Sequence, residues 1–214
     1  LEEGGMSKVR FMILPLLTKL RQICIDPKIV YVGYDGGSNK IDRFIEIVEE
    51  VISNGEKILV FTSFRTALNI VNEELKKKNI KSHIIDGTVS SKDRIERVND
   101  FNENDEVKVF LIMLKSGGTG LNLTAASTVI HLDLWWNPQA ENQATDRAHR
   151  IGQKKVVEVI RLVSKGTIEE KVLELGEKKK ELMKKLIDTN QMDNNILSDL
   201  TENDIKNLLA YENK

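Results

Sequence analysis

The chain has 214 residues, of which 40% are hydrophobic and 30% are charged, a composition that is ordinary for a soluble globular protein. Its formal net charge of −1 excludes a uniformly basic nucleic-acid binder, so any surface for DNA must be local or lie partly on other segments. No hydrophobic run approaches the length of a transmembrane helix, and the N-terminus lacks the apolar core of a signal peptide.

The few cysteines and histidines narrow the possible chemistry further. Cys24 is the only cysteine, which excludes an internal disulfide and fits a cytosolic or nuclear location. The histidines, His83, His131 and His149, are scattered without the spacing of metal ligands, so we expect no metal site in this chain.

The N-terminal segment has the spacing of a helix. Residues 6–25 carry apolar side chains on one helical face, and Arg21 is expected to lie on another face. Pro15 is expected to kink or interrupt this helix, because proline lacks the backbone N–H that a helix interior needs.

The middle of the chain alternates short apolar runs with amphipathic segments. The apolar runs predict strands at residues 57–61, 81–85, 107–114, 127–132 and 155–163. The amphipathic segments predict helices at residues 39–53, 65–78 and 90–101, and another helix after Asn137-Pro138. Ser38 is predicted to cap the first of these helices. This alternation indicates an α/β fold with a doubly wound parallel sheet.

A long charged helix is predicted from Gly166 to about Asp188, and it could pack back across the sheet. Thr167 and Glu170 have the spacing of a capping box at its start. Residues 197–209 are predicted to form a last helix.

The helix after Asn137-Pro138 places three polar side chains on one face. Gln143, Arg147 and Arg150 stand at positions i, i+4 and i+7. The two arginines repel each other at this spacing, and an anion between them would remove the repulsion. Converging guanidinium groups suit a polyphosphate. The alternative is a solvated charged face, with Glu141 and Asp146 as neighbours.

Three stretches of this region carry motifs: KSGGTGLNLTAA at 115–126, WNPQ at 136–139 and QATDRAHRIGQ at 143–153. Together they strongly resemble motifs V and VI of the Swi/Snf family, which are double-stranded DNA translocases within helicase superfamily 2. The last stretch ends on Gly152-Gln153, whereas the related DEAD-box RNA helicases usually carry an arginine after the corresponding glycine. The resemblance is closest to the prokaryotic branch of the family.

The resemblance implies a division of the chain. Residues 38–165 would form the second RecA-like lobe of the motor, with motifs IV, V and VI. Residues 1–37 would be a helical segment and linker from lobe one, and residues 166–214 a C-terminal helical extension that braces the lobes. The protein would be cytoplasmic and nucleoid-associated if prokaryotic, and nuclear if eukaryotic.

Parts of the ATP-hydrolysing machinery are missing from the sequence. It contains no P-loop of the form G-x-x-x-x-G-K-[ST], and Asp105-Glu106 precedes its strand rather than following it, where a magnesium-binding carboxylate belongs. A start at Leu1, just ahead of a helix, leads us to expect a piece of a longer protein. ATP and Mg²⁺ would then be held mainly by an upstream lobe, and this chain alone would not hydrolyse ATP.

By resemblance, Arg147 and Arg150 would be arginine fingers placed against the charge that develops on the γ-phosphate. Gln143 would support the phosphates or the attacking water. Gly118 and Gly120 would let the motif V backbone turn tightly and approach the nucleotide, and the alternative for both glycines is a plain tight turn.

Contacts with double-stranded DNA are expected at phosphates, because a motor that travels along any sequence must read the backbone. Lys115, Ser116 and Thr119 of motif V are the candidates there. Thr62 and Ser63 match motif IV at the carboxyl end of a strand, where the alternative is that one of them caps the following helix.

Two further residues, Trp136 and Arg97, have alternative roles. Trp136 is expected near the minor groove, with a place in the core or between the lobes as the alternative. Arg97 lies in a region that approaches the DNA backbone in the family, but a solvated face is expected for it.

Two other functions are kept as alternatives. The first is an RNA helicase lobe of the same fold, and the second is a non-catalytic binding module that has lost its motor partner. The DNA-bound protein that such a motor would remodel cannot be read from this sequence.

Overall fold

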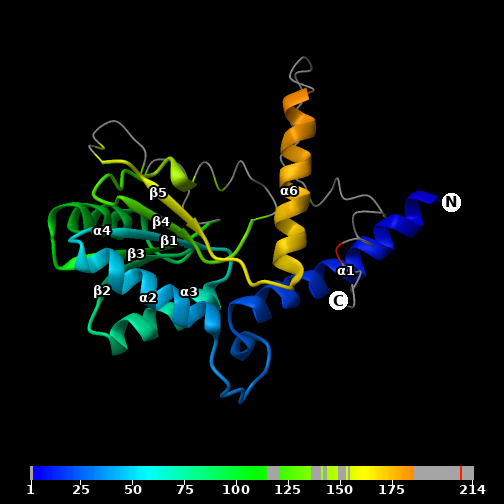
Figure 1. The fold of residues 1–214 in the computed structure, drawn as a ribbon, viewed down its shortest axis with the longest axis horizontal. Helices are drawn as coiled ribbons and strands as arrows, with labels where there is room; N and C mark the ends of the chain where they lie inside the picture. The colour runs from blue at the N-terminus through cyan, green and yellow to red at the C-terminus, as the bar shows by residue number, and fades with distance from the viewer. Residues whose placement is uncertain are drawn as a thin grey trace.

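The computed structural model describes residues 2–114, 121–135, 141, 144–148, 153, 155–185 and 208, with side chains described outside residues 2–11 and 179–185. Within these residues, a parallel sheet is covered by helices on both faces, and longer helices lie at the two ends of the described chain (Figure 1).

Five parallel strands form the sheet, in the order β2-β3-β1-β4-β5. They are β1 (Ile58–Thr62), β2 (Lys81–Ile85), β3 (Val107–Met113), β4 (Thr128–His131) and β5 (Glu158–Arg161). In the central strand β1, Ile58 lies opposite Val109 of β3 on one side and Thr128 of β4 on the other. This order confirms the predicted doubly wound sheet and places the carboxyl ends of all five strands at one edge.

Alternate side chains of β1 enter two separate hydrophobic cores. The helices that cover the sheet are α2 (Asn39–Ser53), α3 (Arg65–Lys77) and α4 (Ser91–Glu103). Ile58 and Val60 pack in the core that contains residues of α2 and α3, whereas Leu59 and Phe61 pack in the core that contains residues of α4. A sheet buried on both faces explains why its strands read as continuous apolar runs.

Helix α2 has the predicted Ser38 cap, and α4 begins with a similar one. The Ser38 hydroxyl accepts a hydrogen bond of 3.3 Å from the Ile41 N–H at the start of α2. Gly55, which follows the end of α2, has φ +77°, a conformation that glycine adopts without strain. Ser90 caps α4 in the same way as Ser38 caps α2, by accepting from the Asp93 N–H at 3.1 Å.

The N-terminal helix α1 spans Glu2–Ile25 as one element with Pro15 inside it, so Pro15 does not interrupt the helix, and the kink that was the other predicted outcome stays a prediction. The turn after the proline is supported by its surroundings. Leu17 is buried, and the Thr18 hydroxyl donates to the Leu14 carbonyl oxygen at 2.8 Å. A short 3-10 helix, η1 (Pro27–Ile29), follows α1.

Helix α6 (Ile168–Lys185) begins with a variant of the predicted capping box. The Thr167 hydroxyl accepts from the Glu169 N–H at 3.2 Å, one position before the residue that a capping box uses. The Glu170 carboxylate accepts from the Gly166 N–H at 2.7 Å. Both side chains therefore satisfy free N–H groups near the helix start.

Helices α1 and α6 are packed against each other (Figure 1). A small hydrophobic cluster joins them, with the buried members Leu17, Leu134, Ile168, Val172 and Leu208. Leu208 is the one described position of the predicted last helix, and it is helical and buried. Among the described residues, no helix is long and apolar enough to cross a membrane.

Candidate nucleotide-facing and DNA-facing site

The predicted site residues fall into two groups. Thr62, Ser63 and Arg147 are described by the structure. The other predicted residues lie outside the described part of the chain: Lys115, Ser116, Gly118, Thr119, Gly120, Trp136, Gln143 and Arg150.

Thr62, the last residue of β1, is fully buried and is bound to Asp133. Its hydroxyl donates to Asp133 Oδ1 at 2.6 Å, and the Ser63 N–H donates to the same oxygen at 2.8 Å. The hydroxyl of Thr62 is thus occupied within the protein, and this arrangement gives no support to the DNA contact predicted for it. Ser63 is half-buried.

The alternative role predicted for Thr62 and Ser63, a side-chain cap on the next helix, is wrong. The N-cap of α3 is Phe64, which makes no side-chain cap bond. Thr62 instead accepts from the Phe64 N–H at 3.3 Å and so holds the turn between strand and helix.

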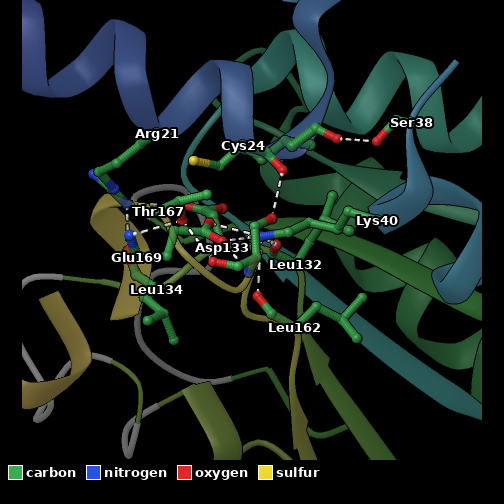
Figure 2. A network of polar contacts seen from close by, with 12 residues as sticks. Arg21, Cys24, Ser38, Lys40, Leu132, Asp133, Leu134, Leu162, Thr167 and Glu169 are labelled. Atoms are coloured by element: carbon green, nitrogen blue, oxygen red, sulfur yellow. Dashed lines mark hydrogen bonds and ion pairs between the residues drawn. The ribbon is translucent and has the colours of Figure 1, made fainter. Parts of the chain in front are cut away.

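Asp133 is the centre of this arrangement, and sequence reasoning missed it. It follows β4, at the edge of the sheet where the strands end. The Arg21 guanidinium, from α1, donates to Asp133 Oδ2 at 2.7 Å and to the Leu134 carbonyl oxygen (Figure 2). It also donates to Ser63 Oγ at 3.3 Å and stacks over the Phe64 ring at 5.2 Å.

The expectation that Arg21 lies away from the apolar face of α1 is therefore wrong. Arg21 stands four residues after the buried Leu17, so both occupy one face of the helix. A charged residue inside an apolar stripe was the available signal for a buried partner. The carboxylate that it pairs with lies 112 positions away.

A second buried ion pair lies beside the first. Lys40, in α2, contacts both carboxylate oxygens of Glu169 at 2.5 and 2.6 Å (Figure 2). Its ammonium group also donates to the carbonyl oxygens of Leu132 and Leu162, at 3.3 and 3.0 Å. Glu169 accepts a further bond from the Ser164 N–H at 2.8 Å. This pair fixes the start of α6 to the sheet.

Two serines bind the carboxyl end of α1. The Ser164 hydroxyl donates to the Cys24 carbonyl oxygen at 3.0 Å, and the Ser38 hydroxyl donates to the Ile25 carbonyl oxygen at 2.5 Å (Figure 2). The two serine hydroxyls thus satisfy helix carbonyls that have no partner within the helix.

Burial raises the pKa of the Cys24 thiol, which makes this cysteine a poor nucleophile.

Arg147 lies in a segment that is bonded to the last residues of motif V. The Leu123 N–H donates to the Arg147 carbonyl oxygen at 3.2 Å. The side-chain amide of Gln153 donates to the carbonyl oxygens of Thr124, Ala126 and Ala148, at 3.1, 2.7 and 3.2 Å. The end of motif V and the end of motif VI are thus fastened together by backbone and side-chain bonds.

Glu141 differs from its expected place on a solvated face. It is buried, and one carboxylate oxygen accepts from the Trp135 N–H at 2.9 Å. The other oxygen accepts from Arg161 Nε at 2.8 Å. Asp146, the other predicted neighbour, is exposed.

His131 is the last residue of β4 and lies close to Thr145. It is fully buried, stacks on Phe61 with ring centroids 5.7 Å apart, and has Nε2 3.4 Å from the Thr145 hydroxyl. Burial lowers the pKa of His131, with a smaller opposing effect from Glu141, so the ring is neutral at physiological pH. It therefore packs as a core residue.

At the carboxyl end of β2, three arginines contact Ile84 or Asp86. Asp86 pairs with Arg65 at 2.9 Å, and Arg94 donates to the Asp86 carbonyl oxygen at 3.1 Å. Arg97 is half-buried and donates to the Ile84 carbonyl oxygen, so it is not fully solvated as expected. The hydrogen bond from the Thr88 hydroxyl is the main cause that lowers the pKa of Asp86.

The part of the chain that the structure describes contains no group of three or more histidine, cysteine, aspartate or glutamate side chains that could hold a metal ion.

Known proteins resemble this chain over most of its length. Residues 39–152 match the family described as the Helicase conserved C-terminal domain. An "Uncharacterized ATP-dependent helicase" of Mycoplasma pneumoniae is 45% identical over 181 residues, which cover 85% of this chain and 18% of that protein. The ISWI chromatin-remodeling complex ATPase ISW1 of Saccharomyces cerevisiae is 34% identical over 201 residues, which cover 88% of this chain and 18% of that protein.

A solved structure agrees with these sequence relatives. The Sulfolobus solfataricus SWI2/SNF2 ATPase core, in complex with double-stranded DNA, is 35% identical with a TM-score of 0.76. The alignment covers 96% of this chain and 43% of that chain. The present chain thus spans only about a fifth of the length of the curated relatives that it matches.

Proposed function

The chain belongs to the Swi/Snf family of helicase superfamily 2, as its C-terminal helicase lobe, and we propose that it is the second RecA-like lobe of an ATP-dependent double-stranded DNA translocase. The lobe would span residues 38–165, with residues 1–37 as the linker from lobe one and residues 166–214 as the extension. The matched region, residues 39–152, lies within this lobe and begins one residue after its proposed start.

The nucleotide would bind between this lobe and an upstream lobe that holds most of the ATP and its Mg²⁺. Arg147 and Arg150 would act as arginine fingers on the γ-phosphate, with Gln143 beside the phosphates or the attacking water. Gly118 and Gly120 would let the motif V backbone approach the nucleotide. ATP binding would close the two lobes, and hydrolysis would let them open.

Duplex DNA would be held through its phosphates by the loops that follow β1 and β3. Ser63 belongs to the first loop, and Lys115, Ser116 and Thr119 belong to the second. Because the hydroxyl of Thr62 is bound to Asp133, we assign to Thr62 the positioning of Ser63 rather than a DNA contact. Trp136 follows the fixed Asp133–Trp135 segment and would lie near the minor groove.

One observation carries the proposal furthest. The last residues of motif V are bonded to the residues that carry Arg147, through the Leu123 N–H and the Gln153 amide. The segment that comes after the proposed DNA-binding loop in the sequence is therefore bonded to the segment that carries Arg147. Such a connection is what a motor needs in order to link hydrolysis with movement along DNA.

The test of this function uses the longer natural protein, with the upstream lobe present. ATP turnover is measured alone, with duplex DNA and with RNA. We expect strong stimulation by duplex DNA. Stimulation by RNA alone would move the protein to the RNA helicase class, and absence of turnover in a folded protein would leave a non-catalytic binding module.

A further inference from the structure

The ion pair between Arg21 and Asp133 joins parts of the molecule that the proposed mechanism treats as separate. Arg21 belongs to α1, the helix that the proposed function joins to the upstream lobe, and Asp133 follows β4. Both side chains are almost fully buried, with 6% and 0% of their surfaces exposed. The Arg21 side chain reaches from α1 to the Asp133–Leu134 segment (Figure 2).

Asp133 uses both carboxylate oxygens to receive these bonds. Oδ1 accepts from the Thr62 hydroxyl and the Ser63 N–H at the end of β1, and Oδ2 accepts from Arg21. Arg21 also contacts Ser63 directly, through its hydroxyl. The loop after β1 is thus held by a carboxylate and a guanidinium that come from different elements.

The segment that contains Asp133 is fixed on its other side as well. The Leu134 carbonyl oxygen accepts from Arg21, and the Trp135 N–H donates to the buried Glu141. A shift of α1 would therefore act on both the Ser63 loop and the chain that leads to Trp136.

Stability alone does not explain a polar pair at this place. Removing two charges from water costs about as much as their attraction returns, and apolar residues of similar volume often stabilise a core as well or better. A guanidinium with several fixed acceptors does specify direction, because its donors have a rigid planar geometry. Orientation is therefore the property that this pair supplies.

We propose that Arg21 and Asp133 are positioning residues for the translocation step. They connect α1 to the proposed DNA-facing loop after β1, so that movement of the upstream lobe is transmitted to Ser63. This inference rests on the proposed function, since Ser63 is placed at the DNA by that proposal.

The chain offers a matched control. Lys40 and Glu169 form another buried ion pair, with side chains 5% and 1% exposed. Their bonds reach the carbonyl oxygens of Leu132 and Leu162 and the Ser164 N–H, and none of these three contacts involves the Ser63 loop. A general loss of stability would affect both pairs, whereas a transmission role belongs to Arg21 and Asp133 alone.

The experiment compares Asp133→Asn, Arg21→Lys and the control Glu169→Gln in the longer natural protein. Asparagine keeps an acceptor for Ser63 without the charge, and lysine keeps the charge without the planar fork. The measured quantity is third-strand displacement from a DNA triplex per ATP hydrolysed, together with the melting temperature. We expect this ratio to fall about tenfold in both test variants, the size of a modest coupling energy, and to stay at the wild-type value in Glu169→Gln.

An unchanged ratio in the test variants, or an equal fall in Glu169→Gln, would overturn the proposal. If the wild-type protein shows no DNA-stimulated turnover, the proposed function fails, and hydrogen exchange then tests the connection by itself. The amides of residues 62–64 should exchange faster in Asp133→Asn and Arg21→Lys than in Glu169→Gln. Equal exchange in all three variants would contradict the connection.

Discussion

The side-chain nitrogen Nε2 of Gln153 donates to the carbonyl oxygen of Ala126 at 2.7 Å, and the side-chain oxygen Oε1 of Gln153 accepts from the Lys155 N–H at 2.9 Å. The Gln153 side chain thus donates to backbone oxygens of motifs V and VI and accepts from the residue that leads to β5. Arginine, which the DEAD-box helicases usually carry at this place, has five donors and no acceptor. The glutamine is therefore suited to fasten motif VI to the segment that precedes β4.

Gln153→Glu tests this fastening with a change of nearly equal size. A carboxylate at neutral pH would face three backbone carbonyl oxygens that now receive hydrogen bonds. We expect a loss of about 1–3 kcal/mol in the free energy of unfolding, measured by denaturant titration. Asn99→Asp, at an exposed position of α4, is the matched control and should change stability by less than about 0.5 kcal/mol. Similar losses in both variants would contradict the role of Gln153.

The buried pair of Lys40 and Glu169 predicts a strong difference between single and double variants. Lys40→Met leaves the Glu169 carboxylate buried without its cation, and we expect this to cost about 3–5 kcal/mol. Lys40→Met combined with Glu169→Leu removes both charges and should recover much of the loss. Chemical denaturation of the three proteins measures the difference. A double variant as unstable as the single one would show that the charge imbalance is not the cause.

His131 predicts a pH dependence of stability. Because burial lowers its pKa in the folded protein below the ordinary value of 6.5, the unfolded chain takes up a proton first as the pH falls. Stability from this group is complete above pH 6.5 and is lost on acidification, by at most about 1.4 kcal/mol per pH unit. Unfolding measured from pH 7.5 to pH 5 should show a smaller slope in His131→Asn than in the wild type. Equal slopes would refute this origin.

The proposed phosphate contacts predict a change in salt dependence. Lys115→Ala should weaken duplex binding at all sequences and reduce the slope of log affinity against log salt by about 1. Lys76→Ala serves as the control, because Lys76 is exposed on α3 and pairs with Glu73 on the same helix. Binding of duplex DNA by the longer protein is followed by anisotropy at several salt concentrations. A slope that changes equally in both variants would remove Lys115 from the DNA site.

The local parts of the fold were predictable because each depends on residues close together in the sequence. The apolar run of β1 and the Ser38 cap of α2 needed only neighbouring side chains. Family motifs added the identity of the lobe, which periodicity alone does not give. Pro15 misled the prediction, because the packing that keeps α1 helical comes from the surrounding chain.

The polar interior was not predictable, for a physical reason. Arg21 and Asp133 are separated by 112 positions, and Lys40 and Glu169 by 129 positions, so no local pattern links either pair. Arg21, Lys40 and Glu169 lie on helices, where charged residues are common, and Asp133 lies in the loop after a strand, so none of them names its partner. Only the packing of α1 and α6 against the end of the sheet brings them together and removes them from water.

The most direct test of the central claim is ATP turnover by the longer protein with Arg150→Ala, at saturating ATP and duplex DNA. Loss of an arginine finger should lower turnover on the order of a thousandfold. Arg43→Ala is the control, since Arg43 is exposed on α2 and pairs with Glu46, and its turnover should equal that of the wild type. Turnover in Arg150→Ala within a few-fold of the control would contradict the claim that this lobe supplies the arginine fingers.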